Sequence, residues 1–113
     1  MTRRDDERIQ DILEACGRLA EIAVRGRPAY DGDWVLRDAA NYNLTVIGEA
    51  LDSLSDEFVA RHPDLPVRQA KSLRNKLTHE YFVADSDILW DTITQDVPDL
   101  ATQFAAIRNA AGQ

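Results

Sequence analysis

Four polar side chains of different chemistry fall within eight residues of the chain. The stretch SLRNKLTHEYF, residues 72–82, holds Arg74, Asn75, His79 and Tyr81. An arginine can donate two parallel hydrogen bonds to phosphate oxygens, and a histidine changes its charge near neutral pH. An amide and a phenol can donate or accept hydrogen bonds beside them. The stretch is therefore either a site that does chemistry on a phosphate or the polar end of a helix, where cations complement the helix dipole.

The spacing of these residues restricts how one chain could assemble such a site. Asn75 and His79 are four apart and share a helix face, whereas Arg74 and His79 are five apart and lie about 140° apart around a regular helix. Two arrangements would bring Arg74 and His79 together. In the first, the helix ends near Thr78, so that the chain direction changes and His79 turns toward Arg74. In the second, a two-fold axis places the same segment of a second subunit opposite the first.

The positive charge of the chain is concentrated around this stretch. The net charge is −7, which by itself argues against a nucleic-acid partner. Residues 61–76, however, carry five basic side chains against the single Asp64, a net of +4. The five are Arg61, Arg68, Lys71, Arg74 and Lys76. This cluster is either a solvated helix face or an RNA-binding patch, for which Arg68, Lys71 and Lys76 are the candidates beside the central stretch.

Length and composition indicate one ordinary domain. The 113 residues are 44% hydrophobic and 29% charged, so we expect a single domain over residues 1–113. No apolar run approaches the roughly 20 residues needed to span a bilayer, and no signal peptide is evident, which favours the cytoplasm. Cys16 cannot form an internal disulfide and lies on an apolar stripe, which predicts a core thiol. No Cys, His and Asp spacing indicates a metal site, and His62 and His79 lie far apart in the sequence.

Periodic apolar residues predict helices almost throughout. A first helix has its stripe between Ile9 and Ala23 and stops at Gly26 and Pro28. Residues 28–33 are expected to be a loop, with Asp31 or Asp33 as the next N-cap. A long second helix is predicted from the stripe Leu36, Ala40, Ile47, Ala50 and Leu54, widened by Ala39, Tyr42 and Val46, with Asn43 and Glu49 near its edge.

The second half of the chain follows the same pattern. Ser55 is expected to cap a short helix over residues 56–61, and Pro66 to begin a helix that buries Val67, Ala70, Leu73 and Leu77. Asp85 or Ser86 could cap a last helix that runs through Pro98 with a kink. The fold class is therefore an all-α antiparallel four-helix bundle with an additional short helix. The aromatic residues predicted to lie in its core or at an interface are Trp34, Phe58, Phe82, Trp90 and Phe104.

The pattern Arg-Asn-three-His-any-Tyr resembles the signature of the HEPN superfamily, and specifically its HepT-like toxin branch. The segments NLTVIGEAL (43–51), RHPDLP (61–66) and DILWDTITQDVPDL (87–100) are similar to the second helix, the loop before the motif helix and the last helix of that branch. Together they cover roughly residues 35–104 in the right order. Val67 stands where the branch usually has a tryptophan, a difference that we expect to affect packing rather than activity.

The resemblance implies a dimeric helical bundle that cuts RNA without a metal or cofactor. His79 would take the proton of the RNA 2′-OH, Arg74 would stabilise the charge on the phosphate, and Asn75 would support one of them. It further implies the toxin of a type VII-like toxin–antitoxin system, whose partner is a minimal nucleotidyltransferase antitoxin that transfers AMP to Tyr81. Two alternatives stay open: a non-catalytic nucleotide- or partner-binding HEPN module, and a structural helical dimer. The roles of Asn43 and Glu49 are not determined.

Overall fold

The structure is a computed structural model that describes residues 3–69, 72 and 86–112. Every regular element in these ranges is helical, which agrees with the expected all-α fold. The elements, in chain order, are α1 (Arg3–Val24), α2 (Arg27–Gly32), α3 (Trp34–Asp52), α4 (Asp56–Arg61), α6 (Ser86–Asp91), the π-helical turn η2 (Thr92–Asp96) and α7 (Val97–Ala111). Residues 67–69 are also helical, as expected after Pro66, whereas Ala70, Leu73, Leu77, Phe82 and Asp85 lie outside the described residues.

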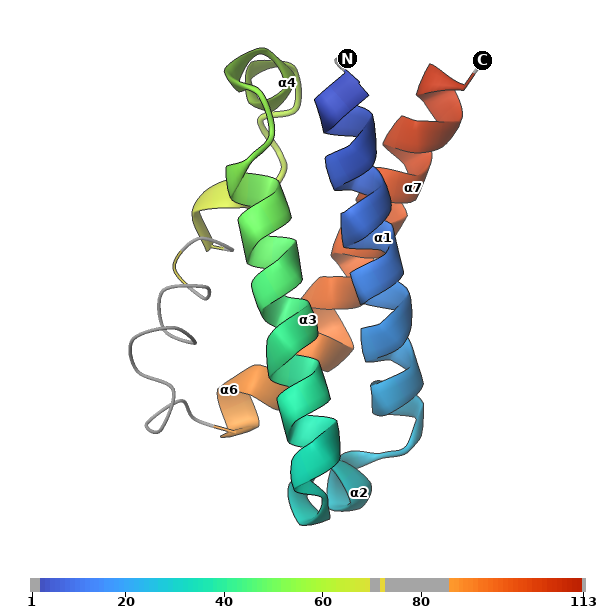
Figure 1. Cartoon of the computed structure of the whole chain (residues 1–113), viewed down its shortest axis with the longest axis vertical. Coiled ribbons are helices and arrows are strands. Elements are labelled where there is room, and N and C mark those ends of the chain that lie inside the picture. The colour runs from blue at the N-terminus through green and yellow to red at the C-terminus, as the bar shows by residue number, and fades with distance from the viewer. Residues whose placement is uncertain (1–2, 70–71, 73–85, 113) are drawn as a thin grey trace.

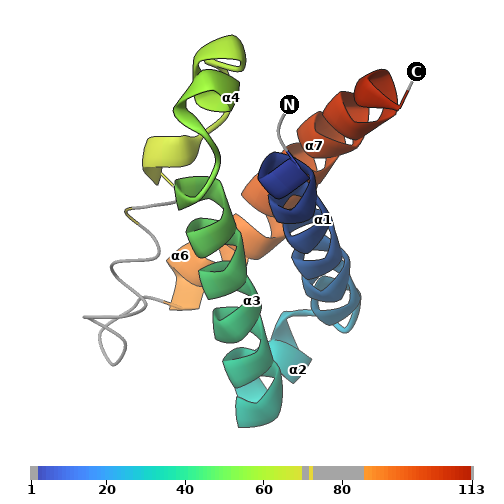
Figure 2. The ribbon, with the colours of Figure 1, turned by 45° about the horizontal axis from the view of Figure 1, so that its top comes forward.

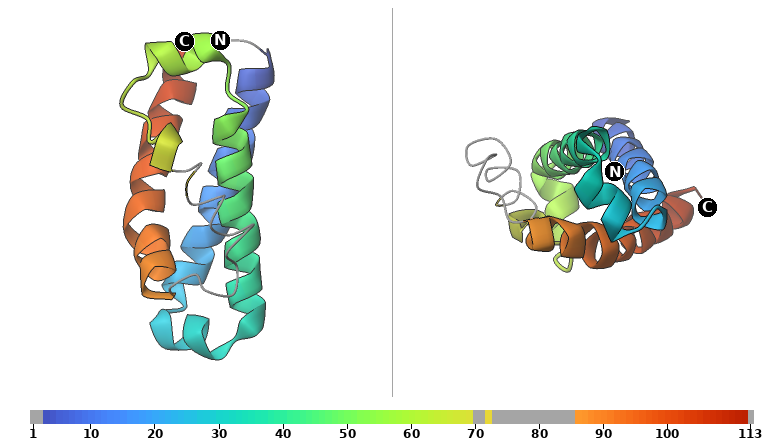
Figure 3. Two further views of the ribbon diagram at one scale, coloured as in Figure 1. Left: turned by 90° about the vertical axis from the view of Figure 1, so that its left-hand side faces the viewer. Right: turned by 90° about the horizontal axis from the view of Figure 1, so that it is seen from below.

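The long helices form a bundle with a short helix at each end. Helices α1 and α3 lie side by side and run in opposite directions, and the segment α6–η2–α7 passes behind both of them (Figures 1 and 2). Helix α2 connects α1 to α3 at one end. Helix α4 lies across the other end, where both termini are found (Figure 3). The antiparallel arrangement of the described helices therefore follows the prediction.

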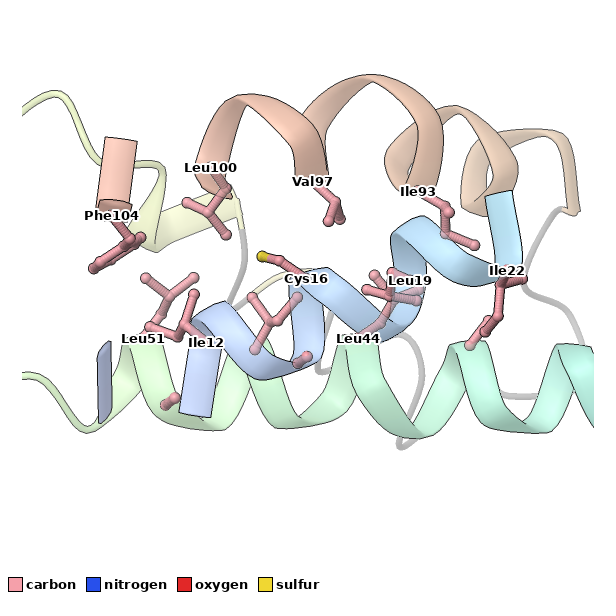
Figure 4. Close-up of a cluster of buried hydrophobic side chains, with 14 of the residues drawn as sticks. Ile12, Cys16, Leu19, Ile22, Leu44, Leu51, Ile93, Val97, Leu100 and Phe104 are labelled. Atoms are coloured by element: carbon pink, nitrogen blue, oxygen red, sulfur yellow. The ribbon is translucent and has the colours of Figure 1, made fainter. Parts of the chain in front are cut away.

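The core is built from the stripes that the sequence predicted. Side chains of α1 lie between α3 and the α6–η2–α7 segment, and Figure 4 shows Cys16 and Leu19 between Leu44 on one side and Val97 on the other. Cys16 is buried as expected. Because burial disfavours the thiolate, it raises the pKa of the Cys16 thiol to about 11, so this cysteine is a neutral core side chain at physiological pH.

The stretch over residues 28–33, predicted to be a loop, is mostly helical, so that prediction is wrong. Helix α2 begins directly after Gly26, whose φ of 87° lies in the region open mainly to glycine. Pro28 stands in the first turn, where its fixed φ suits a helix and its missing N–H costs no hydrogen bond. The helix is stabilised by burial of Tyr30, which is 1% exposed. Asp33 then caps α3 as predicted, because its Oδ1 accepts from the backbone N–H of Val35 at 2.9 Å.

The start of α4 is fixed by two residues that lie 50 positions apart. Ser55 caps the helix as predicted, since its Oγ accepts from the N–H of Phe58 at 3.1 Å. Its own N–H and Oγ donate to the carboxylate of Asp5, at 2.9 and 2.7 Å. Asp5 is buried, so these hydrogen bonds replace the water that a carboxylate would otherwise bind. The first turn of α1 is thereby joined to α4.

The last helix is one continuous segment, as predicted, but its irregularity precedes Pro98. The π-helical turn spans Thr92–Asp96, and the N–H of Val97 donates to the carbonyl of Thr92 five residues back. A proline inside a helix lacks an N–H and clashes with the carbonyl four residues earlier. The wider turn accommodates Pro98 near the start of α7 and keeps Leu89, Ile93 and Val97 on the buried side.

Some side chains of α3 and α6 lie elsewhere than the sequence pattern predicted. Tyr42 was expected to widen the buried stripe of α3 but is 66% exposed. Trp34, predicted to lie in the core or at an interface, is equally exposed and so is not a core residue, while the interface stays a prediction. Asn43, expected near the edge of the stripe, is only 5% exposed. Trp90 is half-buried and packs against Tyr30, with ring centroids 5.1 Å apart. Phe58 and Phe104 are core residues as predicted.

Candidate functional site

The motif residues themselves fall outside the described part of the chain. These are Arg74, Asn75, His79 and Tyr81, together with Lys71 and Lys76 of the predicted RNA-binding patch. Arg68 is the member of that patch that the structure describes. Residues on both sides of the motif are described as well, up to Gln69 with Ser72 before it and from Ser86 after it.

A large groove lies where these two flanks meet the bundle. Its volume is about 770 Å³, and three parts of the chain line it. Helix α3 contributes the wall Leu44, Ile47, Gly48 and Leu51. The stretch before the motif contributes Asp64, Pro66, Arg68, Gln69 and Ser72. The segment after the motif contributes Ile88, Thr92, Asp96, Val97, Asp99, Leu100 and Gln103.

Described residues on both sides of segment 73–85 line this groove. Ser72 is the residue before the segment, and Ile88 stands two residues after the start of α6. The groove has an apolar floor, formed by α3, and a polar rim, which is the usual construction of a ligand site.

The polar rim of this groove on the side of α7 was not predicted from the sequence. Thr92, Asp96, Asp99 and Gln103 recur at intervals of four, three and four residues, which is the period of a helix face. The signal was thus a second, polar stripe beside the apolar one. The sequence could not indicate that this stripe faces a groove rather than open solvent, because that depends on the position of α3.

The charges of the described rim are mainly negative. Asp64, Asp96 and Asp99 stand against Arg68 alone, a net of −2. Arg68 is exposed and forms no ion pair with another described residue. A phosphate bound here would therefore need further cations, which the sequence offers in Lys71, Arg74 and Lys76.

The start of α6 contacts α2 through an ion pair and through a pair of aromatic rings. Arg27 Nη2 of α2 lies 2.5 Å from Asp87 Oδ1 of α6, while within α2 Arg27 Nε lies 3.1 Å from Asp31 Oδ2. One turn along, Tyr30 packs on Trp90. Hydrogen bonds to these carboxylates, that to Asp87 first, raise the pKa of the Arg27 guanidinium. Because the ion pair is exposed, we attribute the anchoring chiefly to the buried Tyr30 ring.

Asn43 has an unusual environment for a buried amide. Its Nδ2 donates to the carbonyl of Ala39 at 2.8 Å, but no described group donates to its Oδ1. The Oδ1 of Asn41, two residues earlier on α3, is also buried with no donor among the described residues. A buried acceptor without a hydrogen bond lowers stability, so a hydrogen-bond donor placed at either of these two Oδ1 oxygens would be favourable.

In residues 3–69, 72 and 86–112, none of the helices combines the length and the apolar character of a membrane span. No group of three or more His, Cys, Asp or Glu side chains in those ranges is arranged to hold a metal ion.

Comparison with known proteins identifies the family. Residues 12–107 match the family model described as Ribonuclease HepT-like. The chain is 38% identical to the "Probable ribonuclease HepT" of Thermococcus cleftensis over 112 residues, which cover 96% of this chain and 99% of that one. No solved structure gives a significant match.

Two other relatives are similar over most of their length. A protein named "Putative RNase" of Caldanaerobacter subterraneus subsp. tengcongensis is 37% identical over 88% of this chain and 89% of its own. Another of that name, from Methanocaldococcus jannaschii, is 30% identical over 95% of this chain and 100% of its own. The family match includes every motif residue, and with the all-α bundle it leads to one conclusion: the chain belongs to the HepT-like ribonuclease family.

Proposed function

We propose that this protein is a metal-independent endoribonuclease and the toxin of a type VII-like toxin–antitoxin pair. The observation that carries the proposal is that Arg74, Asn75, His79 and Tyr81 are all present within the span that matches the HepT-like family. The same match over residues 12–107 supports a single domain over the whole chain. The large groove between α3 and α7 is lined by Ser72 and Ile88, which flank the motif segment in sequence, and this supports a ligand site nearby.

The proposed reaction uses the nucleophile that RNA itself carries. His79 removes the proton of the 2′-OH, and the 2′-oxygen then attacks the adjacent phosphorus. The bond from phosphorus to the 5′-oxygen breaks, and that oxygen takes up a proton as it leaves. Arg74 stabilises the negative charge on the pentacoordinate phosphate, and Asn75 orients His79 or donates to a phosphate oxygen.

The reaction scheme determines the products and the substrate class. One RNA product ends in a 2′,3′-cyclic phosphate and the other begins with a 5′-OH. DNA lacks the 2′-OH, so it binds without being cut. Incubation of the purified protein with total RNA in the presence of EDTA, followed by analysis of the product ends, tests the proposal. RNA that binds but stays intact would favour the non-catalytic HEPN module instead.

We expect the protein to be a homodimer in solution. Arg74 and His79 diverge on a regular helix, and a two-fold axis that brings two motif segments to one cleft would remove this difficulty. It would also double the +4 charge of residues 61–76 against an otherwise acidic surface. The exposed hydrophobic side chains Trp34, Val35 and Tyr42 on α3 offer apolar area for such contacts.

Light scattering coupled to size-exclusion chromatography measures the oligomeric state directly. The expected mass is twice the 12.7 kDa of the chain at micromolar concentration. A mass of 12.7 kDa under these conditions would contradict the dimer and with it the shared cleft.

Tyr81 is the proposed site of inactivation by a minimal nucleotidyltransferase antitoxin. Transfer of AMP to its hydroxyl adds the bulk of a nucleotide and about one negative charge near Arg74. That charge competes for the guanidinium and repels an incoming RNA phosphate. Tyr81→Phe is therefore expected to keep full nuclease activity, because the hydroxyl has no part in the cleavage chemistry, and to escape neutralisation.

Co-expression of each form with a minimal nucleotidyltransferase, followed by intact-mass measurement and a growth assay, checks this prediction. The wild type should gain mass in AMP units and the Tyr81→Phe variant should not. Tyr42→Phe provides a matched control, since Tyr42 is an exposed tyrosine outside the motif. An AMP adduct on Tyr81→Phe, or growth rescue equal to that of the wild type, would make Tyr81 a structural residue.

A further inference from the structure

A second groove lies at the end of the bundle, between α4 and the last turns of α7. Its volume is about 480 Å³, and it shares no lining residue with the groove beside the motif. Figure 3 shows α4 lying across this end of the molecule. One wall holds Phe58, Arg61 and His62, and the other holds Ala106, Ile107, Ala110 and Ala111.

The ring of His62 packs against the aromatic ring of Phe58. Its centroid lies 4.5 Å from that of Phe58, with the planes inclined by 38°. Phe58 in turn lies parallel to Phe104, at 6.5 Å and 7°. Both phenylalanines are buried, whereas His62 is only partly covered. The three rings form a series that runs from the core to the groove and presents an aromatic ring at a fixed position.

The charged side chain that lines this groove is basic, although the chain has a net charge of −7. The chain has 20 acidic and 13 basic residues, yet none of the seven lining residues is acidic and Arg61 is basic. The Arg61 guanidinium lies 3.3 Å from Glu57 and its side chain is still 52% exposed, so it can exchange this partner for a phosphate. Arg61 also begins the +4 segment that leads to the motif.

The opposite wall has no side chain that could form hydrogen bonds with a specific base. Alanine and isoleucine side chains offer only apolar contact, and Ala106 and Ala110 leave room beside the His62 ring. The groove of about 480 Å³ thus has an aromatic ring on one wall and small apolar side chains on the other. Single-stranded RNA is recognised by this combination of an aromatic ring for stacking and a guanidinium for the backbone.

We propose that this groove is an accessory site for an unpaired base of single-stranded RNA, with the base stacked on His62 and its phosphate at Arg61. The inference rests on the proposed function, because it adds a contact to the same RNA outside the cleavage site. Stacking depends on the π-face that every base has, so the site accepts all four bases and requires that they be unpaired. A paired base in a duplex is excluded because its faces are already stacked.

The His79→Ala variant permits a direct test, because the chain has two histidines and this variant leaves His62 alone. The probe is a short single-stranded RNA of mixed sequence, which the variant binds without cutting. Titration is followed by the carbon-bound ring proton resonances of His62. We expect saturable upfield shifts from the ring current of a stacked base, and no such shift with the same sequence as a duplex.

A pair of variants on α7 tests the contribution to affinity. Ala110→Glu fills the groove and adds a carboxylate, and it is expected to weaken single-stranded RNA binding about tenfold, the loss of about 1.4 kcal/mol. Asn109→Glu adds the same charge on the same turn to a residue that does not line the groove. It is expected to change the affinity by less than about twofold, as for an exposed substitution.

The outcomes separate this inference from the proposed function. If the wild type cuts RNA but RNA does not shift the His62 resonances of the His79→Ala variant, the accessory site is contradicted and the ribonuclease proposal stands. If RNA shifts these resonances but the wild type does not cut it, the accessory site stands and the ribonuclease proposal is contradicted. If Ala110→Glu and Asn109→Glu weaken RNA binding equally, the loss comes from the added negative charge and not from the groove, which contradicts the base site. RNA that neither binds nor is cut would overturn both.

Discussion

Replacing His79 with alanine is expected to lower the rate of RNA cleavage by about a hundredfold or more, with RNA still bound. The reason is that the 2′-OH is a poor nucleophile until a base removes its proton, and alanine offers none. Arg74→Ala should lower the rate by a similar factor and also weaken binding, because the guanidinium contacts the phosphate both before and during the reaction.

Single-turnover cleavage of a labelled RNA, with binding measured separately by fluorescence anisotropy, distinguishes the two roles. His79→Ala should change the rate alone, whereas Arg74→Ala should change both quantities. Arg18→Ala is a suitable control for the loss of a cation, since Arg18 is exposed on α1 and far from the motif in sequence. Cleavage that needs added magnesium and persists in His79→Ala would contradict the proposed chemistry.

Phe104→Ala is expected to cost about 3–5 kcal/mol of the free energy of unfolding. Phe104 is completely buried and packs parallel to Phe58, so its removal leaves a cavity between α7 and α4. A loss of this size is a large part of the stability of a typical small domain. The same change should disturb the support of the His62 ring, because Phe58 lies between Phe104 and His62.

Urea unfolding followed by circular dichroism, at one fixed protein concentration, gives the free energy of unfolding for comparison. Val24→Ala also removes apolar atoms, but from a side chain that is 87% exposed at the end of α1, and it should change that free energy by less than about 0.5 kcal/mol. If the two variants were equally stable, the described packing between α4 and α7 would be wrong.

The sequence alone was sufficient for the features that depend on neighbouring residues. The apolar stripe of α1, the caps Asp33 and Ser55, and the continuous last helix were all predicted from residues within a few turns of each other. The reason is that helix periodicity and capping involve contacts between residues up to about four positions apart, which the sequence displays directly. The HepT-like resemblance was likewise confirmed, because a motif is a local pattern.

Features that depend on contacts between distant residues were missed or misassigned. Residues 28–33 lack a helical pattern of their own, and α2 forms because Tyr30 is buried against Trp90, 60 positions away. Tyr42 and Asn43 are adjacent on α3, yet the tyrosine is exposed and the asparagine buried. Which side of a helix is buried depends on its neighbours, and at the edge of a stripe the residue types do not decide it.

The candidate sites likewise include parts that the sequence shows and parts that only the tertiary structure shows. The motif and its cations were evident from residue types, whereas the two grooves were not. Each groove has walls from segments that are distant in sequence, such as Leu44 with Asp96, or His62 with Ala110. The sequence determines which chemical groups are available within a few turns, but only the packing of α3, α4 and α7 decides which of them face one another, because long-range contacts are selected by the fit of whole helices.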